Sequence, residues 1–122
     1  MKNHANPVTD EDADKFADYM NYWQQELGLM DWRIVRSPKR AANAMAEVAK
    51  RDVEARLASY RIGSHFGSQP VTDKALSSTA CHEALHILLA ELIEAVKADI
   101  KPELIMAAEH RVVHTLERLL VK

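Results

Sequence analysis

The segment His82-Glu83-Ala84-Leu85-His86 combines residue types and a spacing that suit metal chemistry. Positions i and i+4 lie on one face of an α-helix, so both imidazoles can reach one Zn²⁺ ion. Glu83 follows the first histidine and projects beside the pair, where it can act as a general base toward water activated by the metal. The pattern therefore predicts a zinc site on a helix, with a carboxylate placed to accept a proton.

The helix that carries this motif is expected to bury its histidines. On a helical wheel, His82 and His86 fall about 40° apart. They share their side of the wheel with Leu89 and Ile93, which are typical core residues. Burying two imidazoles requires partners, and a metal ion supplies them. The alternative is a pair of core histidines that hydrogen-bond to the backbone.

The last helix offers the third protein ligand that a catalytic zinc site requires. Glu109 falls inside the apolar stripe of this helix, where a lone carboxylate is unfavourable unless it is paired or bound to a cation. That stripe consists of Ile105, Ala108, Val112, Val113, Leu116, Leu119 and Leu120. The alternative is an ion pair between Glu109 and an arginine at the core edge, namely Arg33, Arg56 or Arg61. His110 and His114 fall on the solvent side of the wheel, and we expect them to be surface residues.

Capping and stop signals place the helices around the motif. Thr9 can cap a first helix, with Asp12 reaching back as a short capping box, and Gly28 can end it. The motif helix begins after Thr72, and the last helix has Pro102 in its first turn. The expected helical ranges are 10–27, 73 to 97 or 98, and 102–120.

The segment 41–62 carries conflicting signals. Its content of Ala, Glu, Lys and Arg favours a helix. However, Val53, Ala55 and Leu57 alternate with charged residues, as they would in a strand. The segment 32–35 is easier to interpret, because it is aromatic and β-branched and is followed by a proline, so a strand is predicted there.

Composition limits the class of protein. The chain has 122 residues, of which 48% are hydrophobic and 28% charged, so we expect one globular domain over 1–122 with a flexible tail at 1–8. A net charge of −2 argues against nucleic acid as a partner, and the longest strongly apolar run, 87–90, is too short for a membrane span. The only cysteine, Cys81, excludes an internal disulfide and is expected in the core. Because the start of the chain lacks an apolar signal segment, we expect a cytoplasmic location.

The motif, together with Glu109 on the next helix, resembles the gluzincin branch of the zinc metallopeptidases. The chain is most similar to the single-domain minimal forms, including small metallopeptidase-like proteins encoded by phages. The looser parts of the resemblance are Leu27–Ile34, Arg56–Gly63 and Glu109–Glu117. The resemblance implies a zinc peptidase in which His82, His86 and Glu109 hold the metal, Glu83 is the general base and the substrate is a peptide or protein.

The same resemblance implies an α+β, zincin-like fold. It would comprise an N-terminal helix, a small antiparallel sheet of about three strands, the motif helix and a C-terminal glutamate helix. It resolves the segment 41–62 into two strands, near 43–50 and 53–62, of which the second would be the sheet edge above the metal. An exposed edge can bind an extended peptide by strand addition. Tyr60 and His65 are open candidates for the residue that helps to polarise the scissile carbonyl.

Two other classes of protein stay open at this point. A catalytically silent or latent zinc-binding domain would act as a protein-interaction module, and His4 of the tail could then supply a fourth ligand. An all-helical interaction protein without metal would result if the segment 41–62 were helical and the motif histidines belonged to the core.

Overall fold

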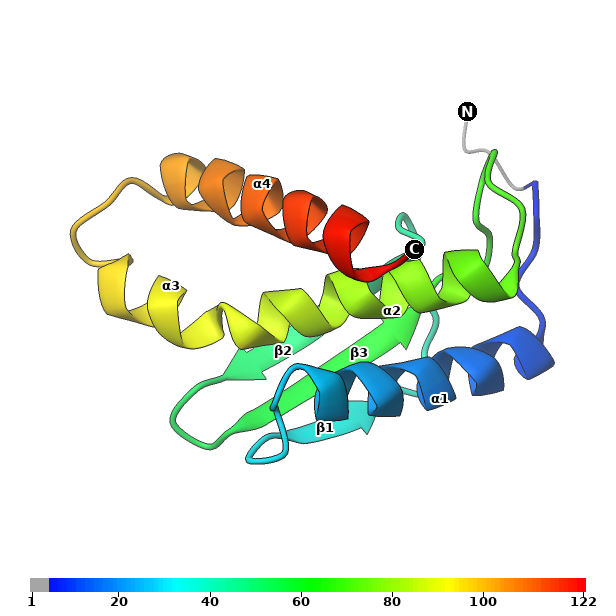
Figure 1. Cartoon of the computed structure of the whole chain (residues 1–122), viewed down its shortest axis with the longest axis horizontal. Helices are drawn as coiled ribbons and strands as arrows, with labels where there is room; N and C mark the ends of the chain where they lie inside the picture. Colours follow the sequence, from blue (N-terminus) through cyan, green and yellow to red (C-terminus); the bar gives the residue numbers. More distant parts are fainter. Residues whose placement is uncertain (1–4) are drawn as a thin grey trace.

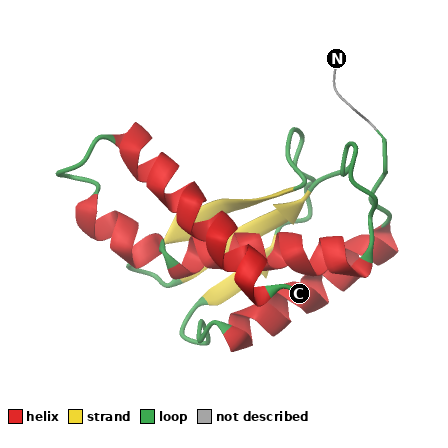
Figure 2. Ribbon diagram, turned by 45° about the horizontal axis from the view of Figure 1, so that its top comes forward, coloured by secondary structure: helices red, strands yellow, loops and turns green. Residues whose placement is uncertain are grey.

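The computed structural model of the chain describes residues 5–122 and shows an α+β fold, with helices packed on one face of a three-stranded sheet (Figures 1 and 2). The elements in chain order are α1 (Asp10–Glu26), β1 (Arg33–Arg36), β2 (Ala46–Asp52), β3 (Leu57–Ile62), α2 (Asp73–Leu88), α3 (Ala90–Val96) and α4 (Pro102–Leu120). The strands in the segment 41–62 rule out the all-helical alternative. Within residues 5–122, no helix has both the length and the apolar character needed to cross a bilayer.

Helix α1 begins and ends as its sequence predicts. The Thr9 side chain accepts a hydrogen bond from the backbone N–H of Asp12 at 3.0 Å, and the Asp12 carboxylate accepts one from the backbone N–H of Thr9 at the same distance. This capping box satisfies two amide groups that would otherwise lack partners. Gly28 follows the helix with φ of 69°, a conformation that favours glycine. The inward face of α1 then buries Phe16, Met20 and other apolar side chains against the sheet and α2.

The sheet has the strand order β1-β3-β2 and is mixed, so the expected antiparallel sheet is only half right. Strands β2 and β3 form an antiparallel hairpin, whereas β1 and β3 are parallel. The difference arises in the connection 37–45, which crosses the end of β3. Strands β1 and β2 are therefore not neighbours, and β3 lies between them. Ala41 donates to the carbonyl of Ile62 at 2.9 Å, and Gly63 donates to the carbonyl of Met45 at 2.7 Å, which fixes this crossing.

The edge of the sheet nearest to the motif is β2, not the later strand. The expectation that the strand near 53–62 would be this edge is wrong, because β3 fills the centre of the sheet. The turn between β2 and β3 also lies later than the expected strands, near 43–50 and 53–62, imply. It follows Asp52, whose carboxylate accepts a hydrogen bond from the Ala55 amide at 3.0 Å, and it uses a positive φ of 53° at Arg56.

Part of the expected flexible tail is packed against the protein. Asn6 donates its side-chain amide to the Gly67 carbonyl at 2.7 Å, and the backbone N–H of Val8 donates to the Ser64 carbonyl at 2.8 Å. Val8 is also buried in the core. The burial of Val8 and these two hydrogen bonds therefore hold residues 5–8 against the loop that precedes α2. His4 lies outside the described residues.

The long motif helix is interrupted once. The sequence predicts one helix to residue 97 or 98, but α2 ends at Leu88 and α3 continues from Ala90. Leu89 still donates to the Leu85 carbonyl and accepts from Ile93, each at 3.0 Å, so the helical direction is kept through the interruption. The chain then turns back, and α4 lies along α2 (Figure 1).

Helix α4 packs on α2 with the Val113 edge of its apolar stripe rather than with the centre of that stripe. Val113 is completely buried, and Glu109 and Glu117 lie one turn before and after it on the same face. In contrast, Val112 is 41% exposed and Leu119 is 62% exposed. The rotation has a physical reason, because the opposing side of α2 carries the polar groups of the motif and these pair with carboxylates rather than with aliphatic side chains.

Candidate metal centre

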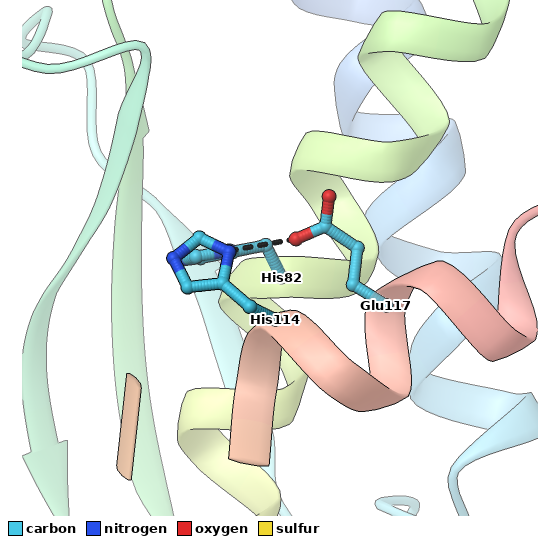
Figure 3. Close-up of side chains that lie close together, drawn as sticks. All are labelled: His82, His114 and Glu117. Carbon is cyan, nitrogen blue, oxygen red and sulfur yellow. Dashed lines mark hydrogen bonds and ion pairs between the residues drawn. The ribbon is translucent and has the colours of Figure 1, made fainter. Parts of the chain in front are cut away.

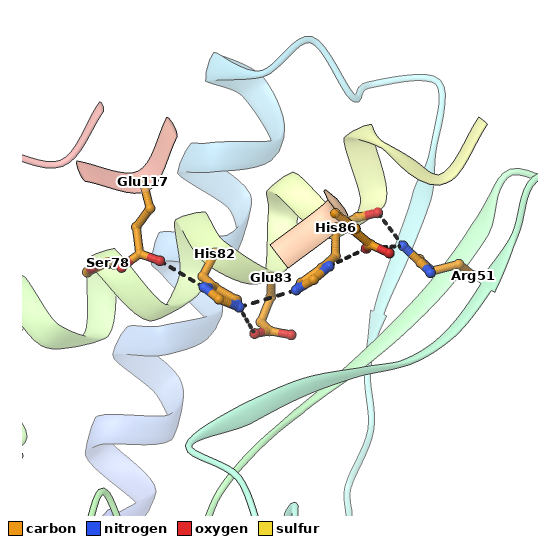
Figure 4. Close-up of polar contacts among 7 residues, drawn as sticks. Arg51, Ser78, His82, Glu83, His86 and Glu117 are labelled. Atoms are coloured by element: carbon orange, nitrogen blue, oxygen red, sulfur yellow. Dashed lines mark hydrogen bonds and ion pairs between the residues drawn. The ribbon is translucent and has the colours of Figure 1, made fainter. Parts of the chain in front are cut away.

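The three motif residues lie in the middle of α2 and point toward the space between β2 and α4 (Figure 4). His82 and His86 are partly buried, with side chains 21% and 14% exposed, and Glu83 is buried. The Nε2 atoms of the two imidazoles are 3.2 Å apart. The structure therefore brings together the histidine pair and the carboxylate that the sequence predicts.

Each motif histidine has a carboxylate on its Nδ1 atom. Nδ1 of His82 lies 2.8 Å from Oε1 of Glu117, and Nδ1 of His86 contacts Oε2 of Glu109. Burial alone would raise the pKa of both glutamates, but their hydrogen bonds outweigh it and hold each pKa below its usual value. Because both carboxylates are ionised, each Nδ1 must carry the hydrogen. The lone pairs of the two neutral imidazoles then reside on the Nε2 atoms.

Two unprotonated nitrogens 3.2 Å apart need a positive species between them. One solution is an extra proton, and His82 would carry it: burial lowers its pKa, but the Glu117 hydrogen bond and nearby carboxylates raise that pKa overall. The pKa of His86 is lowered, mainly by burial. The other solution is a metal ion. Two nitrogen ligands of a tetrahedral Zn²⁺, each at about 2.0–2.1 Å, are roughly 3.3 Å apart, which matches this pair.

Glu109 lies at the site, but on the outer side of His86. Its Oε2 atom contacts Nδ1 of His86 and accepts a hydrogen bond from Nη1 of Arg51 at 2.8 Å. The same guanidinium nitrogen donates to the backbone carbonyl of His86, also at 2.8 Å. The ion pair of Glu109 is therefore made with Arg51 of β2 and with none of the three arginines considered from the sequence. Arg51 was missed because the pairing depends on where the edge strand lies.

A second carboxylate, Glu117, was not anticipated from the sequence. One ligand atom from each of His82, His114 and Glu117 lies within 4.8 Å of the others, so this group is also able to hold a cation (Figure 3). Ser78, one turn before His82 on α2, donates its hydroxyl to Oε2 of Glu117 at 2.6 Å. The spacing His114-x-x-Glu117 beside the H-E-x-x-H helix was the available signal.

The expectation that His110 and His114 lie at the surface is confirmed, but their rings also lie beside the motif histidines. Both are solvent-exposed, but the His114 ring centroid lies 5.0 Å from that of His82, and the His110 centroid lies 5.4 Å from that of His86. The rotation of α4 toward its Val113 side explains this placement. Four imidazoles therefore line one side of the candidate centre.

Glu83 has the environment of a general base. Burial is the main cause that raises its pKa to about 7, and the charge of His82 and a backbone hydrogen bond with Val48 of β2 oppose the rise. A carboxylate with a pKa near neutrality accepts and returns protons efficiently at physiological pH. Its Oε2 atom lies 4.0 Å from Nε2 of His82, so this carboxylate is next to one of the two facing imidazole nitrogens.

The site is open to solvent along a groove. Two hollows share Ala46, His82 and Glu83 in their linings. One extends toward Gln69 and Ser78, and the other extends toward Met106. Strand β2 forms one wall and α4 the other, so an extended chain in this groove would lie beside an unpaired strand edge.

The other residues considered from the sequence lie away from the centre. Tyr60 is buried in the core, with its ring centroid 5.7 Å from that of Phe16 of α1. His65 bridges to Pro7 at the N-terminal segment. Cys81 is completely buried, and burial raises the pKa of its thiol to about 12, which confirms it as a core residue and not a reactive thiol.

Comparisons of the chain with protein-family models, with curated proteins and with solved structures found no match.

Proposed function

We propose that this protein is a zinc-dependent peptidase, in which His82 and His86 hold the metal and Glu83 is the general base. The observation that carries the proposal is the pair of Nε2 atoms 3.2 Å apart with Glu83 beside them, and Glu117 on Nδ1 of His82 leaves the Nε2 atom of that ring free for coordination. Imidazole and carboxylate donors are the set that catalytic zinc sites use. The H-E-x-x-H segment and its resemblance to gluzincins support the same assignment.

Bound zinc would supply a Lewis acid that acidifies water and polarises the carbonyl of a peptide bond. The residues of the chain supply the rest. Glu83 accepts the proton of the attacking water and then delivers it to the nitrogen of the leaving amine. The edge of β2 binds the extended substrate by strand addition, with its residues Ala46, Glu47 and Val48 along the groove.

The third ligand of the proposed site is Glu109 of α4. Its carboxylate already contacts the His86 ring, and binding the metal would require it to release Nδ1 of His86. The pair of hydrogen bonds from Arg51 holds the Glu109 side chain beside the His86 turn. His114 is the alternative ligand, because it lies on α4, as Glu109 does, and is near His82.

Metal content of the purified protein tests this ligand set. We expect about one zinc per chain in the wild type without added metal, and loss of that zinc in His82→Ala and Glu109→Ala. Zinc should remain in His114→Ala and in Glu103→Ala, the matched control, which removes an exposed glutamate from the first turn of α4. Circular dichroism of each variant checks that the fold is kept.

The contrary results are distinct. Zinc retained in Glu109→Ala but lost in His114→Ala would move the third ligand to His114. A folded wild type with no zinc would reject the proposal and leave a metal-free interaction protein. Zinc bound by the expected ligands but no hydrolysis of any peptide would leave the silent zinc-binding module.

A further inference from the structure

Both carboxylate oxygens of Glu117 are engaged by α2. Oε1 lies 2.8 Å from Nδ1 of His82, and Oε2 accepts the Ser78 hydroxyl hydrogen at 2.6 Å (Figure 4). Ser78 and His82 are one helical turn apart, so the same face of α2 presents both donors. The side chain of Glu117 is 21% exposed, which places these contacts at the margin of the core rather than in open solvent.

This arrangement fixes two properties of the His82 ring. A hydrogen bond from Nδ1–H to an ionised carboxylate sets the tautomer, and therefore leaves Nε2 with its lone pair. The same bond, with Glu117 itself held by Ser78, limits rotation of the ring. Nε2 is directed at Nε2 of His86 as a result. A carboxylate behind a histidine ligand also makes that ligand a stronger donor to a metal.

The position of Glu117 on α4 gives the contact a rigid support. Val113, one turn earlier, is completely buried and anchors α4 on α2. Glu117 therefore reaches His82 from a fixed helix, and its own freedom is restricted by the serine. Arg51 and Glu109 are placed similarly around His86, but the proposed function assigns Glu109 to the metal. Glu117 is left as the carboxylate that acts only through a histidine.

We infer that Glu117, held by Ser78, is a positioning residue that orients His82 and sets its tautomer for metal binding. The inference rests on the proposed zinc site and deepens it by assigning a role to α4 beyond the supply of a ligand. It also interprets the group of His82, His114 and Glu117: the Glu117 carboxylate binds Nδ1 of His82, on the side of the ring away from the metal, and is not a ligand of the metal.

The experiment is to measure zinc affinity by competition with a chromophoric chelator in the wild type, Glu117→Gln, Glu117→Ala and Ser78→Ala. Loss of an outer carboxylate partner of a histidine ligand weakens metal binding by roughly 10- to 100-fold. We expect an effect of that size in Glu117→Ala. Smaller effects of the same sign are expected in Glu117→Gln, which keeps an oxygen that accepts the Nδ1–H, and in Ser78→Ala. Glu103→Gln, an exposed change on the same helix, is the matched control and should bind as the wild type does.

Substitution of the metal by Co²⁺ separates positioning from direct ligation. If Glu117 acts through His82, the visible absorption bands of the Co²⁺ form should keep their position and intensity in Glu117→Ala once the site is saturated. Altered bands in that variant would make Glu117 a ligand and overturn the inference. Unchanged zinc affinity in folded Glu117→Ala would also overturn it, while the proposed zinc site would stand. A folded wild type that binds neither ion would reject the proposed function and this inference with it.

Discussion

Peptide hydrolysis by the zinc-loaded protein is expected to fall by roughly a hundred- to ten-thousandfold when Glu83 is replaced by glutamine. The zinc content should stay at about one ion per chain, because Glu83 is next to the histidine pair but has no assigned role in holding the metal. Glutamine has almost the same shape as glutamate and can still accept the hydrogen bond that Val48 makes with Glu83. What it cannot do is take a proton from water.

The measurement uses zinc-loaded wild type and Glu83→Gln with fluorescein-labelled casein and with a mixed peptide library, and cleavage is followed by fluorescence and by mass spectrometry. Glu94→Gln is the matched control, since Glu94 is an exposed glutamate of α3 that pairs with Lys97. This variant should cleave at the wild-type rate. Hydrolysis retained in Glu83→Gln, with zinc bound and the control unaffected, would show that Glu83 is not the base.

The helices are the part of the fold that local patterns predict well. Capping residues mark the start of α1, and a glycine with positive φ follows its end. A proline marks the first turn of α4. The structure agrees with these predicted limits. These signals are strong because each acts through backbone groups within a few residues. The interruption at Leu89 has no such signal, because neither glycine nor proline occurs there and the local hydrogen bonds persist.

The sheet could not be predicted in the same way. In the segment 41–62, helix propensity and strand alternation disagree, and only the family resemblance favours strands. The strand order depends on how the connection 37–45 crosses β3, which is a matter of distant backbone pairing. Helix-forming residues such as Ala46 and Glu47 form a strand here because pairing with β3 outweighs a weak local preference.

In the candidate site, too, the residues of the local motif could be predicted, whereas those that come from other elements could not. His82, Glu83 and His86 follow from one contiguous motif, and the structure brings them together. Arg51 and Glu117 reach the motif from other elements, and their roles depend on the edge position of β2 and on the rotation of α4. A helical wheel assumes that the most apolar stripe faces the protein. For α4 this holds only for the Val113 edge of the stripe, because the opposing face of α2 carries the motif histidines, which pair with carboxylates.

The stability of the metal-free protein should depend on pH through Glu83. The pKa of Glu83 is raised from 4.5 to about 7 in the folded protein, mainly by burial, so the folded state holds this proton more tightly than the unfolded state does. The stabilisation is fully present below pH 4.5 and is lost as the pH rises through 7. At about 1.4 kcal/mol for each pKa unit, the free energy of unfolding loses about 3 kcal/mol over this range from this group.

Urea unfolding of chelator-treated wild type and Glu83→Gln at several pH values between 4.5 and 8 measures this contribution. The variant cannot ionise at this position, and the other titrating groups are common to both proteins, so the difference in unfolding free energy isolates Glu83. It should shift by about 3 kcal/mol in favour of the variant as the pH rises. Saturating zinc should reduce that shift, because a nearby cation stabilises the ionised carboxylate. A difference that does not change with pH in the metal-free proteins would mean that Glu83 is ionised throughout, and that burial does not prepare it as a base with a pKa near neutrality.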